Sequence, residues 1–128
     1  MSKITEYKIK IKRLDQNLLK EAIDLMASEL NNVSIMNRKS FETYGDTVNV
    51  RGTCIKLGEY KYPVDVYVNA KNELMLNGDT DDIGMFRRKK LVKKIEQFYS
   101  GVEMSHVFGV PLDYDQNENK LELRIPIS

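Results

Sequence analysis

The sequence is poor in the residues that build disulfide or metal-held frameworks. It has one cysteine and one histidine in 128 residues, which excludes an intrachain disulfide framework and a cysteine-rich zinc site. It has no run approaching the ~20 apolar residues that a membrane-spanning helix needs. Its opening residues alternate charged and apolar side chains, a pattern unlike that of a signal peptide. We therefore expect a cytoplasmic protein with no membrane partner.

Neither sign of charge dominates the chain. Twenty lysine and arginine residues oppose 19 acidic ones, for a formal net charge of +1, so no global field predicts a nucleic-acid or an acidic partner. A chain of this length forms one domain and can bury roughly two thirds of its unfolded surface. We expect a single domain over residues 1–128 that folds without a cofactor or a metal.

The most distinctive segment is a basic amphipathic helix, predicted between Asp79 and Gly101. Acidic residues precede the basic run, where the positive end of a helix dipole favours carboxylates, and Gly101 is expected to end the helix. Apolar residues recur at spacings of three and four, which is typical of a helix that is buried on one side. The predicted buried residues are Leu91, Val92, Ile95, Phe98, Tyr99 and Val102.

Alternating or short apolar stretches predict the strands. A second amphipathic helix is predicted from the N-cap Asp15 to Leu30, and residues 37–46 are expected to form a mobile loop. The short connections favour antiparallel pairing. The predicted fold is an α+β two-layer sandwich, a mostly antiparallel sheet with two amphipathic helices on one face, in the order β-α-β-β-β-β-α-β-β. The predicted strands cover residues 4–13, 33–36, 47–57, 64–68, 74–76, 103–110 and 121–127.

Three phrases suggest a family. Val50-Arg51-Gly52, the strand Val64-Asp65-Val66-Tyr67-Val68 and the helical phrase Lys94-Ile95-Glu96-Gln97-Phe98-Tyr99 resemble phrases of the hypothetical chloroplast reading frame thirty-five family of plastids and cyanobacteria. Members also open with a strand and an amphipathic helix. Because this family has no established activity, the resemblance implies a fold and no chemistry.

A cluster of lysine and arginine on one helix is what contact with a phosphate backbone needs. The strand residues Lys8, Lys10 and Lys12 would extend this basic surface if the two elements lie side by side. The alternative is a solvated helix face that the preceding acidic turn balances. The candidate nucleic-acid-binding residues are Arg87, Arg88, Lys89, Lys90, Lys93 and Lys94.

The stretch 77–82 invites a comparison with a calcium-binding loop. Asn77, Asp79 and Asp81 occupy the first, third and fifth positions of such a loop. Its sixth position needs glycine and holds Asp82, and its twelfth needs glutamate and holds Arg88. We therefore interpret the segment as a turn with an N-capping aspartate, and we predict no metal site.

His106 and Cys54 are the remaining candidates for chemistry. No nucleophile motif surrounds the lone histidine, and a cysteine inside a strand is expected to pack as a small apolar residue. We assign no catalytic residue. An enzyme with an unrecognised site stays open, and a deep pocket holding His106, Cys54 or the turn 79–82 would favour it.

The sequence thus predicts a non-enzymatic binding or interaction module that self-associates through an edge strand or an exposed apolar patch. The alternative is a nucleic-acid-binding domain that uses the basic helix 87–94. Steep weakening of binding by salt would separate the second hypothesis from the first.

Overall fold

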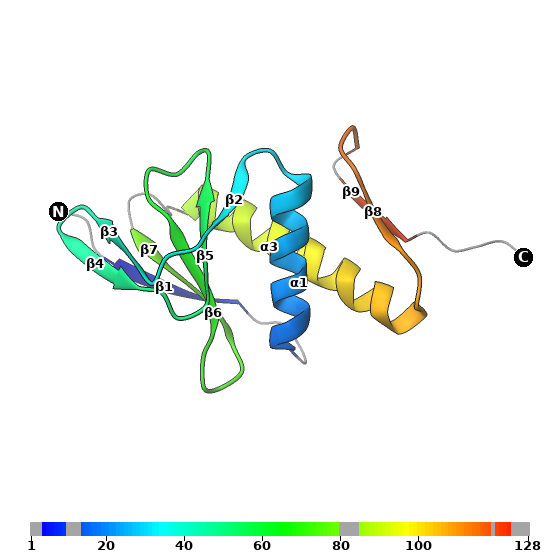
Figure 1. The fold of residues 1–128 in the computed structure, drawn as a ribbon, viewed down its shortest axis with the longest axis horizontal. Coiled ribbons are helices and arrows are strands. Elements are labelled where there is room, and N and C mark those ends of the chain that lie inside the picture. The colour runs from blue at the N-terminus through cyan, green and yellow to red at the C-terminus, as the bar shows by residue number, and fades with distance from the viewer. Residues whose placement is uncertain (1–3, 10–13, 80–84, 119, 124–128) are drawn as a thin grey trace, which may run out of the picture.

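A five-stranded antiparallel sheet forms the centre of the structure, a computed structural model that describes residues 4–9, 14–79, 85–118 and 120–123 (Figure 1). The strand order is β1-β7-β6-β5-β2, and each pair of neighbouring strands is antiparallel. This confirms the predicted antiparallel pairing. The strands are β1 (Ile4–Ile9), β2 (Val33–Met36), β5 (Thr53–Leu57), β6 (Val64–Val68) and β7 (Leu74–Asp79).

Two helices, α1 (Gln16–Glu29) and α3 (Met85–Phe108), cross on the same side of this sheet (Figure 1). One core cluster joins the inward side chains of both helices to alternate residues of β5, β6 and β7, among them Ile55, Val64 and Leu74, each 0% exposed. Alternation along a strand sends those residues to one face. The predicted fold class, an α+β arrangement with both helices over one face of the sheet, is confirmed.

Helix α1 begins as the sequence predicts. The carboxylate of Asp15 accepts hydrogen bonds from the backbone N–H groups of Asn17 and Leu18 at 2.8 and 3.2 Å, which satisfies two donors that a helix start leaves without partners. The N–H of Asp15 itself donates to the hydroxyl of Tyr99 on α3, at 2.8 Å. This hydrogen bond fixes the start of one helix against the middle of the other.

Helix α3 buries the face that its spacing predicts, since Leu91, Ile95 and Phe98 are at most 3% exposed. Its predicted end at Gly101 is wrong, because the helix continues to Phe108 and includes residues 103–108 of the predicted strand 103–110. A Cβ at Gly101 would lie 2.8 Å from a methyl group of Leu121. The absence of a side chain at Gly101 therefore leaves room for the C-terminal hairpin to pack against α3. The local sequence pattern does not distinguish this role of a glycine from helix termination.

The predicted mobile loop 37–46 is also wrong. It contains β3 (Ser40–Thr43), which pairs with β4 (Asp46–Asn49). Phe41 anchors this segment, because it is 3% exposed and packs with Val48 and Cys54, whereas Tyr44 is 65% exposed. The predicted strand 47–57 divides into β4 and β5, with the bend between them at Arg51 and Gly52.

The C-terminal hairpin consists of β8 (Leu112–Asp115) and β9 (Lys120–Leu123) and packs against α3 (Figure 1). The predicted strand 121–127 begins one residue earlier, at Lys120, and residues 124–128 lie outside the described part. The order is thus β-α-β-β-β-β-β-β-α-β-β. Of the described helices, none is long and apolar enough to cross a membrane.

Candidate functional site

A hollow of about 570 Å³ lies between the C-terminal end of α1, strands β2 and β5, and the first half of α3. Its volume falls within the ~300–1,000 Å³ that small-molecule sites usually have. It is more apolar than polar. The described residues that line it are Met26, Leu30, Asn32, Val33, Leu57, Glu59, Tyr60, Lys90, Leu91, Lys93, Lys94 and Gln97.

The floor of the hollow consists of core residues. Met26 is 1% exposed, Leu91 3%, Val33 5% and Leu57 8%, and Val33 and Leu57 face each other across the β2–β5 pair. Leu30, half-buried, is the C-cap residue of α1 and packs against the same cluster. These side chains are held by the fold itself, so the floor is formed before any ligand arrives.

One stripe of α3 supplies the rim. Lys90, Lys93, Lys94 and Gln97 have the spacing i, i+3, i+4, i+7, which places them in one line on the side of the helix. This line runs beside the buried stripe that contains Leu91. The sequence predicted the basic helix, but only the packing of α1 and β5 next to this stripe turns its three lysines into the edge of a hollow.

The three rim lysines differ in their surroundings. Lys94 is half-buried: its ammonium lies 3.3 Å from Oε1 of Gln97, 3.4 Å from the hydroxyl of Tyr114, and 5.4 Å from the centre of the Tyr114 ring. Lys90 and Lys93 are exposed, and neither forms an ion pair within the described residues. Their ammonium groups can therefore approach a ligand at the mouth of the hollow.

The opposite wall is the turn after β5. The ammonium of Lys56 donates to the carbonyl groups of Leu57 and Tyr60, and the N–H of Tyr60 donates to the carbonyl of Leu57 at 3.1 Å. These bonds fix the main chain of the turn, and Tyr60 within it is 4% exposed. Glu59, in the same turn, is the acidic residue of the described lining, so three lysines and one glutamate give the hollow a formal net charge of +2.

The predicted nucleic-acid-binding residues do not share one face. Arg88 is half-buried, Lys94 contacts Tyr114, and the side chain of Arg87 lies outside the described residues. At 3.6 residues per turn, Arg88 and Lys90 point about 200° apart around the helix. Lys89, Lys90 and Lys93 are the exposed members. The side chains of Lys8, Lys10 and Lys12 are likewise not described.

The segment compared with a calcium loop has a different structure in its described part. Asn77 and Asp79 belong to β7, where they pair with β1 at Glu6 and Ile4, and they are 6% and 2% exposed. The prediction that they form a turn is wrong, because the strand extends to Asp79. Asp81 and Asp82 lie outside the described residues.

A buried carboxylate on the other face of the sheet links two of the three sequence motifs on which the family resemblance rests. Asp65, 0% exposed, accepts hydrogen bonds from the backbone N–H groups of Arg51 and Gly52 at 2.8 and 3.0 Å. The guanidinium of Arg51 donates to the hydroxyl of Tyr67 at 3.1 Å. The segments Val50-Arg51-Gly52 and Val64 to Val68 thus form one structural unit. These contacts explain both sequence motifs by a structural role, without a catalytic or binding function.

Cys54 and His106 do not come together. Cys54 is 2% exposed on β5, and burial, followed by the charge of Asp65, raises the pKa of its thiol. It packs with Phe41 as an apolar residue, as predicted. His106 lies near the C-terminal end of α3, with its Nε2 2.7 Å from a carboxylate oxygen of Glu21 on α1. Neither residue lines the hollow.

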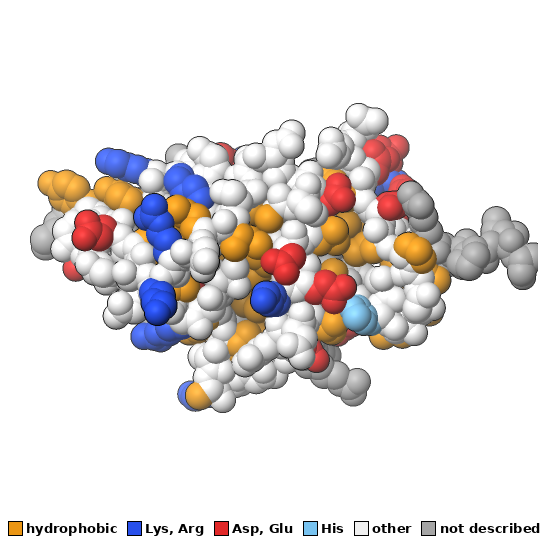
Figure 2. Space-filling model, viewed as in Figure 1, with side chains coloured by type: hydrophobic (Ala, Val, Ile, Leu, Met, Phe, Trp, Pro, Cys, Tyr) orange, Lys and Arg blue, Asp and Glu red, His pale blue; other side chains and the backbone are white. Residues whose placement is uncertain are grey.

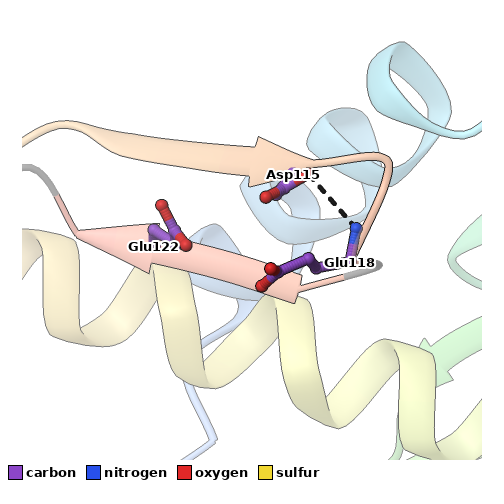
Figure 3. Close-up of side chains that lie close together, drawn as sticks. All are labelled: Asp115, Glu118 and Glu122. Atoms are coloured by element: carbon purple, nitrogen blue, oxygen red, sulfur yellow. Dashed lines mark hydrogen bonds between the residues drawn. The ribbon is translucent and has the colours of Figure 1, made fainter.

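Three acidic side chains gather on the C-terminal hairpin (Figure 3). The carboxylate of Asp115 accepts from the N–H groups of Asn117 and Glu118 at 2.9 and 3.2 Å. The ammonium of Lys120 lies 2.6 Å from Glu118 and 3.6 Å from Glu122. A turn with a capping aspartate and its own lysine explains this cluster.

The surface charge on one side of the molecule is divided. Figure 2 shows lysine and arginine side chains mainly over the sheet, and acidic ones mainly over α1 and the C-terminal hairpin. Large exposed apolar residues at the end of α3 are Met104, Val107 and Phe108, at 46%, 74% and 59%. Self-association through such a patch, or through the outer strands β1 and β2, stays a prediction.

No family model, no curated protein and no solved structure matches this chain. The resemblance to the chloroplast reading-frame family therefore stays a prediction, and the chemistry of the site is argued from its geometry.

Proposed function

We propose that the protein is a non-enzymatic binding module and that it takes a small anionic ligand in the hollow between α1 and α3. One observation carries the proposal: the exposed ammonium groups of Lys90 and Lys93 stand at the edge of a preformed apolar hollow. An apolar cavity with a few convergent polar groups is the usual form of a ligand site. Cys54 and His106, the two residues that the sequence analysis considered for chemistry, lie elsewhere, which supports binding rather than catalysis.

The test uses the fluorescence of 1-anilinonaphthalene-8-sulfonate, an aromatic anion that brightens when it leaves water. We expect the native protein to bind it, and Lys90→Glu to weaken this binding about threefold to tenfold, because reversing an exposed charge changes a pairwise interaction by about 0.5–1.5 kcal/mol. Circular dichroism before each titration shows that the variants are folded.

Lys89 provides a matched control. It is the neighbouring lysine, it is exposed on the same helix, and it does not line the hollow. Lys89→Glu makes the same change in net charge, and we expect it to leave binding within about twofold of the native protein, because a solvated charge outside the site is screened. Equal effects of the two reversals, or no binding at all, would contradict the proposal.

Nucleic-acid binding is the second candidate. It is supported by the exposed Lys89, Lys90 and Lys93 on α3 and by the basic side chains over the sheet in Figure 2. A gel shift with single- and double-stranded DNA and RNA at two salt concentrations tests it. A phosphate-backbone contact weakens steeply with salt, is lost when Arg87, Arg88, Lys89 and Lys90 are changed to glutamate, and responds alike to the single changes at Lys89 and Lys90.

A cytoplasmic location is part of the same proposal. It is supported by the single, buried cysteine, which suits a reducing compartment. Fractionation of the source cells tests it, and recovery of the protein from another compartment would contradict it.

A further inference from the structure

The geometry points to a specific ligand class for the hollow: an aliphatic monocarboxylate with a single alkyl chain. This inference rests on the proposed function and deepens it. The carboxylate would lie at the rim formed by Lys90, Lys93 and Lys94, and the chain would extend over the floor toward α1.

The separation of polar and apolar groups argues for a ligand with one charged end. The three lysines come from one line along α3, whereas the floor residues Met26 and Leu30 come from α1. From Lys90 to Gln97 the line extends for about 10 Å at 1.5 Å per residue. A ligand with charges at both ends would place one of them on the apolar floor, where an unpaired charge is costly.

The number of ammonium groups that are open to a ligand argues for a monoanion. Glu59 opposes the three lysines, and Lys94 is already engaged with Gln97 and Tyr114. Two exposed ammonium groups, those of Lys90 and Lys93, suffice for the two oxygens of one carboxylate. Each further negative charge on a ligand would add to its repulsion by Glu59.

The lining argues for an alkyl chain over a ring system. Met26, Leu30, Val33 and Leu57 are aliphatic, and Met and Leu fit around flexible chains. Tyr60 is the aromatic residue of the described lining, and an aromatic ligand would find no pair of rings to stack between. The aliphatic surface instead matches methylene groups, each of which gains affinity when it leaves water.

The experiment is isothermal titration calorimetry of the native 128-residue chain with hexanoate, octanoate and decanoate, below their critical micelle concentrations. We expect affinity to rise about twofold to fourfold for each added methylene. The neutral analogue 1-octanol should bind several times more weakly than octanoate. Lys90→Gln should weaken octanoate and leave 1-octanol unchanged, whereas Lys90→Arg should retain octanoate binding.

Leu30→Gln tests the floor without removing a residue from the centre of the core. Leu30 is half-buried, and the hydrogen bond that its backbone N–H donates to Met26 remains in the variant. We expect this change to flatten the chain-length dependence. Because the hexanoate–decanoate series uses the native protein, the inference stays testable if the variant fails to fold.

The possible failures are distinguishable. If the sulfonate probe binds in a way that depends on Lys90 but affinity does not rise with chain length, the alkyl-chain inference is overturned and the proposed function stands. If neither the probe nor any carboxylate binds, both are overturned. If octanoate binds the native protein and Lys90→Gln equally well, the placement of the carboxylate is wrong.

Discussion

Gly52 offers the sharpest test of how the sheet and the β4–β5 bend fit together. A Cβ built on Gly52 would lie 2.2 Å from the carbonyl oxygen of Val66 and 2.7 Å from the Cβ of Tyr67. Backbone atoms cannot turn aside as a side chain does, so Gly52→Ala must displace the bend. Forced overpacking of this kind typically costs about 1–3 kcal/mol.

The displacement also affects Asp65. The N–H of Gly52 donates to this carboxylate at 3.0 Å, and a hydrogen bond to a charged group contributes about 1.5–3 kcal/mol. Alanine also lowers the conformational entropy of the unfolded chain, which stabilises the folded state by about 0.4–1 kcal/mol and offsets part of this loss. We expect a net loss of about 2–4 kcal/mol in the free energy of unfolding, which lowers the melting temperature by roughly 6–12 °C for a chain of this size.

Gly58 is the matched control for this substitution. It lies at the other end of β5, and a Cβ there would meet its nearest atom, the Cβ of Asn32, at 3.4 Å. Gly58→Ala should leave the melting temperature unchanged or raise it slightly, by the same unfolded-state effect. Thermal unfolding followed by far-ultraviolet circular dichroism measures both variants. Coincident melting curves for Gly52→Ala and Gly58→Ala would refute the close approach of Gly52 to β6.

The further predictions concern two buried groups, Tyr99 and Cys54. Tyr99→Phe removes the acceptor for the N–H of Asp15 and should lower the free energy of unfolding in urea by about 1–3 kcal/mol, whereas Tyr44→Phe, at a residue that is 65% exposed, should have little effect. Cys54 should react with a thiol reagent at the rate of unfolding in the native protein and at once in urea, because it is buried; fast labelling of native protein would contradict this. Because burial raises the pKa of Cys54 above 9.0, the unfolded chain ionises first, so the stability contributed by the neutral thiol is complete below about pH 9 and declines as the pH rises through the native pKa.

Local patterns were sufficient where a short segment determines its own structure. The N-cap Asp15 and the buried stripe of Leu91, Ile95 and Phe98 follow from spacing and side-chain chemistry alone. The same holds for the alternation of Val64, Val66 and Val68. Such signals depend on neighbours three or four residues away along a helix, or two along a strand, and the sequence contains those neighbours directly.

Local sequence patterns gave wrong predictions where a contact with a residue distant in the sequence determines the structure. Gly101 is compatible with a helix stop, and only the approach of Leu121 explains why it lies inside α3. The polar stretch before β4 is compatible with a loop, and only burial of Phe41 against Cys54 orders it as β3. In both cases the deciding contact comes from a residue more than ten positions away.

The candidate site likewise has features that the sequence predicts and features that only the tertiary structure reveals. The sequence by itself determined that the helix after β7 carries a line of lysines beside a buried apolar stripe, because both follow from a repeat of 3.6 residues per turn. Only the tertiary structure decided that Lys90 and Lys93 border an apolar hollow while Lys89 does not. Residues of α1, β2 and β5 supply the other walls, and their approach to α3 depends on the packing of the whole core, which no spacing along the chain encodes.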